Sequence, residues 1–363
     1  MGLKHLVKKP AETKTKEIDE ELRELLERRK TQIKVVGAGG AGNNTVTRLM
    51  QVGIVGAETI AVNTDAMDLL YTDADKKILI GRELTAGLGA GADPKLGMEA
   101  AKESKEEIKK SLQGADMVFL TGGLGGGTGT GSLPVLAEVS KKLGALTVAI
   151  VTLPFKMEGA RRMENAKWGL ELLQDVVDTL ILVPNDKLLE IVPDVSITTA
   201  FKIADEILVN SVKGIAEMVT KPGLVNLDFA DVRAVMNEGG LAMIGMGESD
   251  TENRAFESVE KALTNPLLDV DITDGKGALI NITGGPDLTV REAQQIVETV
   301  SNRLSKDAKI IWGAQIDHSL GDSVRTLVVV TGVKSPQIFG PERPWTTEEK
   351  KKIQDILGVE FIE

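Results

Sequence analysis

Cysteine is absent from the 363-residue chain. This absence excludes disulfide bonds and thiolate-bound metals, and it fits a reducing compartment. Only two histidines are present, His5 and His318, so a histidine acid or base has few candidates. The longest apolar run, LTVAIVTLPF from Leu146, is far shorter than the roughly 20 residues of a membrane-spanning helix. The first residues also lack the apolar core of a secretory signal. We therefore expect a soluble cytoplasmic protein that does not insert into a membrane.

Positive charge is in deficit. Lys and Arg number 43 against 54 Asp and Glu, for a net charge of −11. A dedicated nucleic-acid binder needs Lys and Arg to neutralise phosphates, so we expect no nucleic-acid partner. The apolar content of 42% is ordinary for a globular protein, and the length exceeds that of one average domain. These numbers predict two domains.

Short runs of Val, Ile and Leu alternate with amphipathic helices from Gln32 onward. Such runs, separated by helices, are typical of a parallel sheet that is covered on both faces. The sequence therefore predicts an α/β fold. The strands predicted in this first block are residues 33–37, 59–63, 77–81, 117–120, 146–153 and 179–184.

A long helical pattern from about residue 198 to 220 follows this block and stops at Pro222-Gly223. A second, smaller α+β block comes next. Its predicted strands are 241–246, 277–283, 309–316 and 325–333, and its predicted helices are 251–264 and 289–304. The division we expect is an N-terminal extension with a short helix (1–30), a first domain (31–195), a central helix and connection (196–225), a second domain (226–333) and a tail (334–363).

Two glycine-rich loops carry the chemistry. Gly37-x-Gly39-x-x-Gly42 follows a predicted strand and opens a helix, which is the context of a dinucleotide-binding fingerprint. This loop alone favours an NAD-dependent oxidoreductase, and a glycine-rich turn without a ligand is the plainer alternative. The second loop, TGGLGGGTGTGS at 121–132, again joins a strand to a helix. Two such loops indicate that several phosphates are bound by backbone N–H groups and helix N-termini.

The ordinary P-loop is excluded, because the chain has no G-x-x-x-x-G-K-[ST] sequence. No lysine stands at the phosphate end of GGGTGTGS. We expect amides, Thr and Ser hydroxyls and a metal ion to balance the phosphate charge instead.

Seven motifs together resemble the tubulin/FtsZ superfamily of GTPases, and within it the archaeal FtsZ type. They are GAGGAGNN (37–44), AVNTDA (61–66), GLGAGADP (87–94), GGLGGGTGTGS (122–132), PFKMEGARR (154–162), PNDKL (184–188) and NLDFADV (226–232). They occur in the family's order, and the resemblance covers about residues 31 to 333. It implies a Rossmann-like parallel-sheet GTPase domain joined by a long central helix to a smaller α+β activation domain.

The resemblance also implies an activity and partners. It predicts a GTPase that polymerises head to tail into filaments of the division ring, at the cytoplasmic division site, with GTP or GDP and Mg²⁺ bound. A nonpolymerising NAD-dependent oxidoreductase and a superfamily relative that acts in cell shape are the alternatives.

The family's nucleotide contacts carry over to this sequence position by position. Asp65 is also the expected metal residue, through water, because Mg²⁺ keeps several of its waters. The residues implied to bind the phosphates, the metal and the ribose are Gly39, Gly40, Ala41, Gly42, Asn43, Asn44, Asp65, Ala90, Gly91, Ala92, Gly126, Gly127, Thr128, Gly129, Thr130, Glu158, Arg162 and Asn185.

Base recognition is assigned to Phe201 and Asp205, which are four residues apart and face one side of a helix. A carboxylate accepts hydrogen bonds from guanine N1–H and its exocyclic amine, and adenine does not offer this pair. The phenyl ring of Phe201 would stack on the base. A core Phe201 and an exposed helix carboxylate form the plainer alternative.

The family's hydrolytic loop corresponds to Asp228, Asp231 and Asn226. These residues follow the long helix, which spans roughly 35 Å, whereas Asp205 lies near the start of the helix. They cannot reach the nucleotide of their own subunit, so they act on that of the next subunit in a heterologous, filament-forming contact. Asp228 as the N-cap of a helix that starts at Phe229 is a compatible structural role.

The tail 353–363 carries apolar side chains after a charged segment. It fits a peptide that docks in the groove of a partner, here a membrane adaptor protein. Packing of the tail on its own second domain is the alternative.

Overall fold

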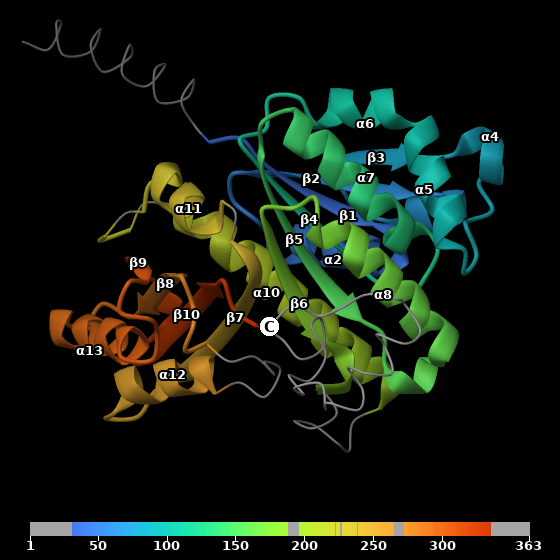
Figure 1. The fold of residues 1–363 in the computed structure, drawn as a ribbon. Coiled ribbons are helices and arrows are strands. Elements are labelled where there is room, and N and C mark those ends of the chain that lie inside the picture. Colours follow the sequence, from blue (N-terminus) through green and yellow to red (C-terminus); the bar gives the residue numbers. More distant parts are fainter. Residues whose placement is uncertain are drawn as a thin grey trace, which may run out of the picture.

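The computed structural model describes residues 31–187, 196–221, 223–225, 227–237, 239–264 and 272–334. Ten strands in these ranges form one sheet in the order β3-β2-β1-β4-β5-β6-β7-β10-β8-β9 (Figure 1). The predicted head helix and the apolar tail 353–363 lie outside the described residues.

The first six strands run parallel to one another, as the sequence predicts. The prediction of β4 stops three residues short, because Thr121, Gly122 and Gly123 continue the pairing with β5 although two of them have no side chain. The strands are β1 (Ile33–Ala38), β2 (Ala57–Asn63), β3 (Lys76–Leu79), β4 (Met117–Gly123), β5 (Leu146–Leu153) and β6 (Thr179–Pro184).

Both faces of this parallel half are buried. Val35 and Val36 are neighbours in β1, so they point to opposite faces and join different apolar clusters. Helices α2 (Gly39–Val52) and α10 (Ile197–Thr220) cover the Val35 face. The Val36 face is covered by α5 (Pro94–Glu103), α6 (Lys105–Leu112), α7 (Thr128–Lys142) and α8 (Ala160–Gln174). The sequence prediction of a doubly covered sheet is confirmed.

The C-terminal strands change the pattern. Strand β10 pairs antiparallel with both β7 and β8, and β8 pairs parallel with β9. Helices pack on this mixed sheet, as expected for the smaller α+β part. The elements are β7 (Gly240–Ser249), β8 (Gly277–Gly284), β9 (Lys309–Ile316), β10 (Val324–Thr331), α11 (Phe229–Met236), α12 (Arg254–Leu263) and α13 (Val290–Ser301).

The two parts share one sheet. Three parallel pairs join β6 to β7, from Thr179 with Gly240 to Ile181 with Ala242. The sequence predicts two successive blocks of strands and gives no sign of this junction. Helix α10 lies beside the junction (Figure 1), and its 24 residues span about 36 Å. Its N-terminus is capped by Ser196, whose hydroxyl accepts from the Thr199 N–H. No helix in the described ranges is long and apolar enough to cross a membrane.

Candidate functional site

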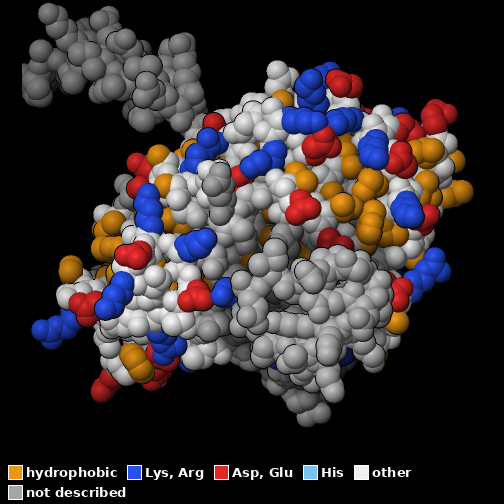
Figure 2. All heavy atoms as spheres, viewed as in Figure 1, with side chains coloured by type: hydrophobic (Ala, Val, Ile, Leu, Met, Phe, Trp, Pro, Cys, Tyr) orange, Lys and Arg blue, Asp and Glu red, His pale blue; other side chains and the backbone are white. Residues whose placement is uncertain are grey.

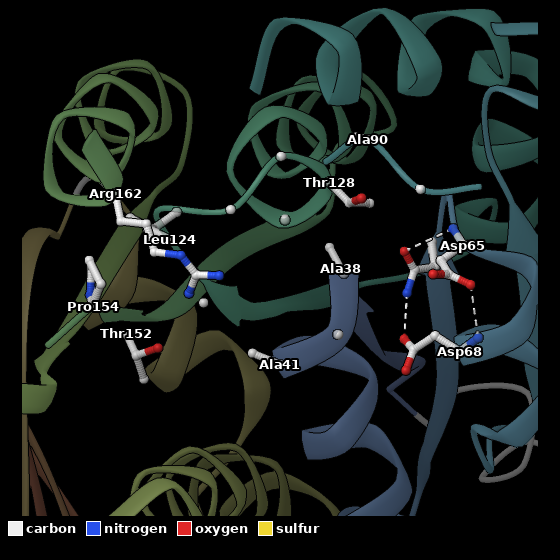
Figure 3. A pocket seen from close by; sticks show the side chains of 18 of the residues that line it. Ala38, Ala41, Asp65, Asp68, Ala90, Leu124, Thr128, Thr152, Pro154 and Arg162 are labelled. Carbon is white, nitrogen blue, oxygen red and sulfur yellow. Dashed lines mark hydrogen bonds between the residues drawn. The ribbon is translucent and has the colours of Figure 1, made fainter. Parts of the chain in front are cut away.

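A cavity of about 520 Å³ opens at the carboxyl ends of β1, β2, β4 and β5 (Figure 3). Open parallel sheets bind ligands at this edge, because the strand-to-helix loops of neighbouring strands meet there. Three loops of backbone line the cavity: residues 38–41, 88–91 and 123–129. Side chains from the end of β2, from α8 and from α10 complete it.

The three loops touch each other through glycines. A Cβ atom on Gly39, whose φ is +69°, would lie 2.8 Å from the Gly129 nitrogen. A Cβ on Gly127 would lie 2.6 Å from the Gly91 oxygen, which also accepts a hydrogen bond from the Gly127 N–H at 3.1 Å. Any larger residue would force these chains apart. The glycines therefore bring three loops to one point.

Two helices begin at the cavity, and no side chain caps the N-terminus of either one. The N-cap residues of α2 and α7 are Ala38 and Gly127, and neither helix has a side-chain cap or an acidic residue in its first turn. The first N–H groups of a helix need acceptors from outside. At Gly40 and Gly126 a Cβ would meet nothing within 4 Å, so space beside the backbone is open. This arrangement suits phosphate oxygens.

Most residues implied by the resemblance line the cavity. They are Gly39, Gly40, Ala41, Asp65, Ala90, Gly91, Gly126, Gly127, Thr128, Gly129, Glu158, Arg162, Asn185, Phe201 and Asp205.

Five of the implied residues do not line it: Gly42, Asn43, Asn44, Ala92 and Thr130. A Cβ on Gly42 would lie 2.6 Å from the Thr121 oxygen, so this glycine serves the packing of α2 on the sheet. Thr130 is buried, and its hydroxyl accepts from the Gly125 N–H at 2.8 Å. Asn44 is exposed on the outer side of α2.

Sequence reasoning missed several lining residues, among them Asn63, Asp68, Thr152 and Pro154. Thr152 and Pro154 stand at the carboxyl end of β5, where the rule on parallel sheets would have found them. Asp68 follows Asp65, the N-cap of α3, by three residues, and a second acidic residue at this spacing was the available signal.

Asp65 has a structural task as well as a position in the cavity. Its Oδ1 accepts from the N–H groups of Met67 (2.9 Å) and Asp68 (3.1 Å), and so caps α3 (Ala66–Tyr71). Within the described residues no three Asp, Glu, His or Cys side chains gather as a metal site. The cavity therefore suits a cation that takes most of its ligands from phosphates and water, as Mg²⁺ does.

Helix α10 contributes Phe201, Ala204 and Asp205 to the lining of the cavity. Phe201 is 42% exposed, and its ring meets that of Phe155 edge to face at 5.3 Å. The alternative of a core Phe201 is therefore wrong. Asp205 lies one turn further on and also lines the cavity. Burial raises the pKa of the Asp205 carboxyl to about 6, and the neighbouring Glu206 carboxylate adds to the rise. The group is still an anionic acceptor at neutral pH.

Polar side chains also line the cavity. Glu158 accepts from the Phe155 N–H at 2.8 Å and forms an ion pair with Arg162. Asn185 is buried, and its Oδ1 has no hydrogen-bond partner in the part of the chain that the structure describes. A buried acceptor without a donor costs about 1–3 kcal/mol, so the site favours a ligand that brings a hydroxyl or amine.

The predicted hydrolytic residues lie elsewhere. Asp228 caps α11, and its Oδ1 accepts from the Asp231 N–H at 2.8 Å, which confirms the predicted N-cap. Neither aspartate lines the cavity. From Asp205 to Thr220 at the end of α10 is about 22 Å of helix. Asn226 lies outside the described residues.

Comparisons with known proteins agree with this geometry. The sequence model of the tubulin/FtsZ family GTPase domain matches residues 32–193, and that of the FtsZ family C-terminal domain matches residues 240–334. Cell division protein FtsZ 1 of Methanocaldococcus jannaschii is 63% identical over 344 residues, which cover 95% of this chain and 93% of that protein. Cell division protein FtsZ 1 of Thermococcus kodakarensis is 60% identical over 341 residues, which cover 93% and 91%.

A solved structure has the same fold. The empty FtsZ dimer of M. jannaschii matches with a TM-score of 0.83 and 63% identity, over 87% of this chain and 92% of that chain. The alternative of an NAD-dependent oxidoreductase is not supported, because the domain that holds both glycine loops matches a GTPase family. The glycine loops with their uncapped helices, the long central helix and these matches have one explanation: the chain belongs to the tubulin/FtsZ family of GTPases.

Proposed function

We propose that this chain binds GTP in the cavity, hydrolyses it and polymerises into filaments that act in cell division at the division site. The observation that carries the proposal is the pair of uncapped helix N-termini, α2 and α7, at one glycine-lined cavity. Family membership supports GTP as the ligand. The names of the relatives, at 60% and 63% identity, support division rather than cell shape as the role.

The geometry suggests a placement for each part of the nucleotide. The phosphates would accept from the amides of residues 39–41 and 126–129. The ribose would lie beside Asn185 and the Glu158–Arg162 pair, and a hydroxyl would supply the donor that Asn185 lacks. The base would stack on Phe201 and donate to Asp205. A site with this buried acceptor rejects bases that lack the matching donors.

Mg²⁺ is part of the proposal. When bound, it would neutralise charge on the phosphates as the γ-phosphate leaves. Asp65 lies at the cavity edge and uses Oδ1 for the cap of α3, so its second oxygen is left for a metal-bound water.

Asp228 and Asp231 would act on the nucleotide of a neighbouring subunit. They lie beyond the opposite end of α10 from Asp205, so no subunit completes its own site. A contact between opposite ends of two copies repeats and forms a filament. The solved dimer of the relative supports self-association of this kind of chain.

Exposed apolar side chains support contact between the two ends. Leu88 at the cavity edge is 85% exposed, and Leu70 and Leu84 are exposed nearby on the same part of the fold. Figure 2 shows apolar side chains gathered over the region of α4 (Arg82–Thr85) and α5. At the other end, Leu224 is 68% exposed and lies four residues before Asp228. Burial of such side chains between copies is favourable.

In the completed site the two aspartates would orient the attacking water. Asp228 is exposed and uses Oδ1 for the cap, so its other oxygen is available to accept from a water. Asp231, one turn further, is half-buried. One carboxylate would accept the proton of the attacking water and the other would orient the water by accepting a hydrogen bond, while the amides of α2 and α7 stabilise charge on the phosphate oxygens. Asn226 would assist from the same loop.

GTP hydrolysis per subunit, measured in Mg²⁺ over a series of protein concentrations, tests the proposal. We expect almost no activity until a threshold concentration, and then a rise, because a second subunit completes the site. Asp228→Asn should bind GTP as wild type does and lose hydrolysis. Constant specific activity down to dilute monomer would place catalysis within one chain and contradict the assignment of Asp228 and Asp231.

A membrane link is a separate part of the proposal. The tail 353–363 carries apolar side chains, and a partner protein at the membrane would bind it as a peptide. Deletion of 353–363 should leave GTP hydrolysis in solution unchanged and remove filaments from the membrane in cells.

A further inference from the structure

Helices α2 and α10 pack against each other, and each contributes to the cavity. The first residues of α2 supply backbone amides, whereas α10 supplies Phe201 and Asp205. Behind the cavity, Leu49 of α2 and Val209 of α10 belong to one buried apolar cluster. The position of α10 on α2 therefore sets the distance between the amides proposed for the phosphates and the acceptor proposed for the base.

Three polar contacts also join α10 to α2 and to the segment that follows it. The Nε and Nη2 groups of Arg48 donate to one carboxylate oxygen of Glu206, at 2.9 and 2.5 Å. The Lys213 ammonium and the Thr220 hydroxyl each donate, at 2.8 Å, to a backbone carbonyl just after α2. Residues 206, 213 and 220 are seven apart, which is about two helical turns, so all three lie on one face of α10.

Of these three contacts, the Arg48–Glu206 pair is the closest to Asp205 along α10, because Glu206 is the next residue. Burial first and the carboxylate of Glu206 second raise the pKa of the Asp205 carboxyl. Arg48 is the one ionisable residue of α2. Its guanidinium offsets the negative charge of Glu206 and so reduces the repulsion that Asp205 experiences.

The surroundings of Asp205 offer little other positive charge. The remaining ionisable residues of the cavity and of the first turns of α10 are Asp65, Asp68, Glu158, Arg162 and Lys202. Arg162 is ion-paired with Glu158, and Lys202 is exposed. Within the described ranges, neither cation forms an ion pair with Asp205 or Glu206. Arg48 is therefore the cation that compensates the charge beside the base acceptor.

We propose that Arg48 is a positioning residue for guanine recognition: through its ion pair with Glu206 it keeps Asp205 an anionic acceptor and fixes α10 against the phosphate-binding helix. The inference rests on the proposed binding of GTP, with the base at Asp205. Arg48 does not line the cavity, so its effect on the nucleotide passes through Glu206 and Asp205.

Loss of Arg48 leaves the Glu206 carboxylate uncompensated, so Asp205 keeps its proton to a higher pH. A protonated carboxyl presents an O–H where a guanine N–H needs an acceptor. The affinity for GTP should therefore suffer more at pH 6, near the pKa of Asp205 of about 6, than at pH 8. Arg48 and Glu206 are 46% and 41% exposed, so water screens the pair. We expect an additional loss of roughly threefold to fivefold at pH 6.

Loss of Glu206 has the opposite electrostatic effect. Without this carboxylate Asp205 ionises at a lower pH, so the affinity of Glu206→Gln relative to wild type should rise from pH 8 to pH 6. Both Arg48→Gln and Glu206→Gln remove the contact between the helices, and both should bind GTP a few-fold less tightly at pH 8. A contact that only held the helices together would change the affinity equally at the two pH values.

The test is a titration of nucleotide-free protein with a fluorescent GTP analogue, mant-GTP, in Mg²⁺ at pH 6 and at pH 8. Protein is kept too dilute to assemble, so affinity is measured without filaments. The ratio of variant to wild-type affinity at each pH cancels the titration of the phosphates, which is common to both. Arg48→Lys keeps the charge, so its ratio should be the same at the two pH values. Arg291→Gln removes an exposed arginine of α13 outside the cavity and is the matched control.

The two substitutions decide the inference together. It is overturned if folded Arg48→Gln protein has the same ratio at pH 6 and pH 8, or if Glu206→Gln changes in the same direction as Arg48→Gln. If Arg48→Gln does not fold, a Glu206→Gln ratio that is equal or lower at pH 6 overturns it. Failure of wild type to bind mant-GTP at pH 8 is a different result, because it contradicts the proposed function.

Discussion

Replacement of Asp205 by asparagine should stabilise the nucleotide-free protein while it abolishes GTP recognition. The carboxyl of Asp205 is partly buried and has no counter-ion among the described residues, and its pKa is raised from 3.8 to about 6 by burial first and by Glu206 second. A rise of about two units corresponds to about 3 kcal/mol that the charged form costs the folded state. Because the residue is partly exposed, water screens this cost, and we expect about 1–2 kcal/mol.

The pH dependence follows from the direction of the shift. With a folded pKa above that of the unfolded chain, the folded state binds more protons between about pH 4 and 6. Wild-type stability therefore falls as pH rises through this window, and the full cost is present above it. Asparagine carries no charge, so the advantage of Asp205→Asn should be largest at pH 7 and about half as large at pH 5.

Urea denaturation of nucleotide-free protein at the two pH values measures this difference as a shift of the midpoint. Asp73→Asn is the control for removal of an exposed acid. Saturating GTP should raise the midpoint of wild type and not that of Asp205→Asn, because a ligand stabilises only a state that binds it. Equal midpoints of the variant and wild type at pH 7 would refute the reasoning, and so would a difference that does not shrink at pH 5.

Other substitutions separate binding from folding. Gly126→Ala should have the melting temperature of wild type and lose about tenfold or more in GTP affinity. Gly131→Ala should unfold at a lower temperature, because its Cβ would lie 2.0 Å from the Pro94 oxygen. Melting curves and titrations with the fluorescent analogue mant-GTP distinguish the two variants. Asn185→Ala should bind GTP less tightly without loss of stability in calorimetry, since its Oδ1 has no partner to lose. Mixtures of Asp228→Ala and Asp205→Ala subunits should recover part of the GTPase activity that each lacks alone, and no recovery would argue against a shared site.

The sequence by itself determined the elements and the chemistry of the loops. Parallel strands that are buried on both faces need continuous apolar runs, so β1 and β5 were visible as such runs. An N-cap needs a short side-chain acceptor one residue before a helix, so the sequence predicted Asp228 correctly as the N-cap of α11. Glycines at strand-to-helix junctions indicated phosphate loops, because backbone approach without Cβ atoms is a local property.

Only the tertiary structure decided which residues meet. The junction of β6 with β7 rests on three residue pairs between segments about sixty residues apart, and no local pattern encodes such pairing. Backbone packing separated Gly126, which lines the cavity, from Gly42, where an added Cβ would meet the Thr121 oxygen. Asp68 became a cavity residue because amides from two distant elements hold it there. A sequence specifies the groups that can bind, whereas long-range packing specifies which of them face one another across a cavity.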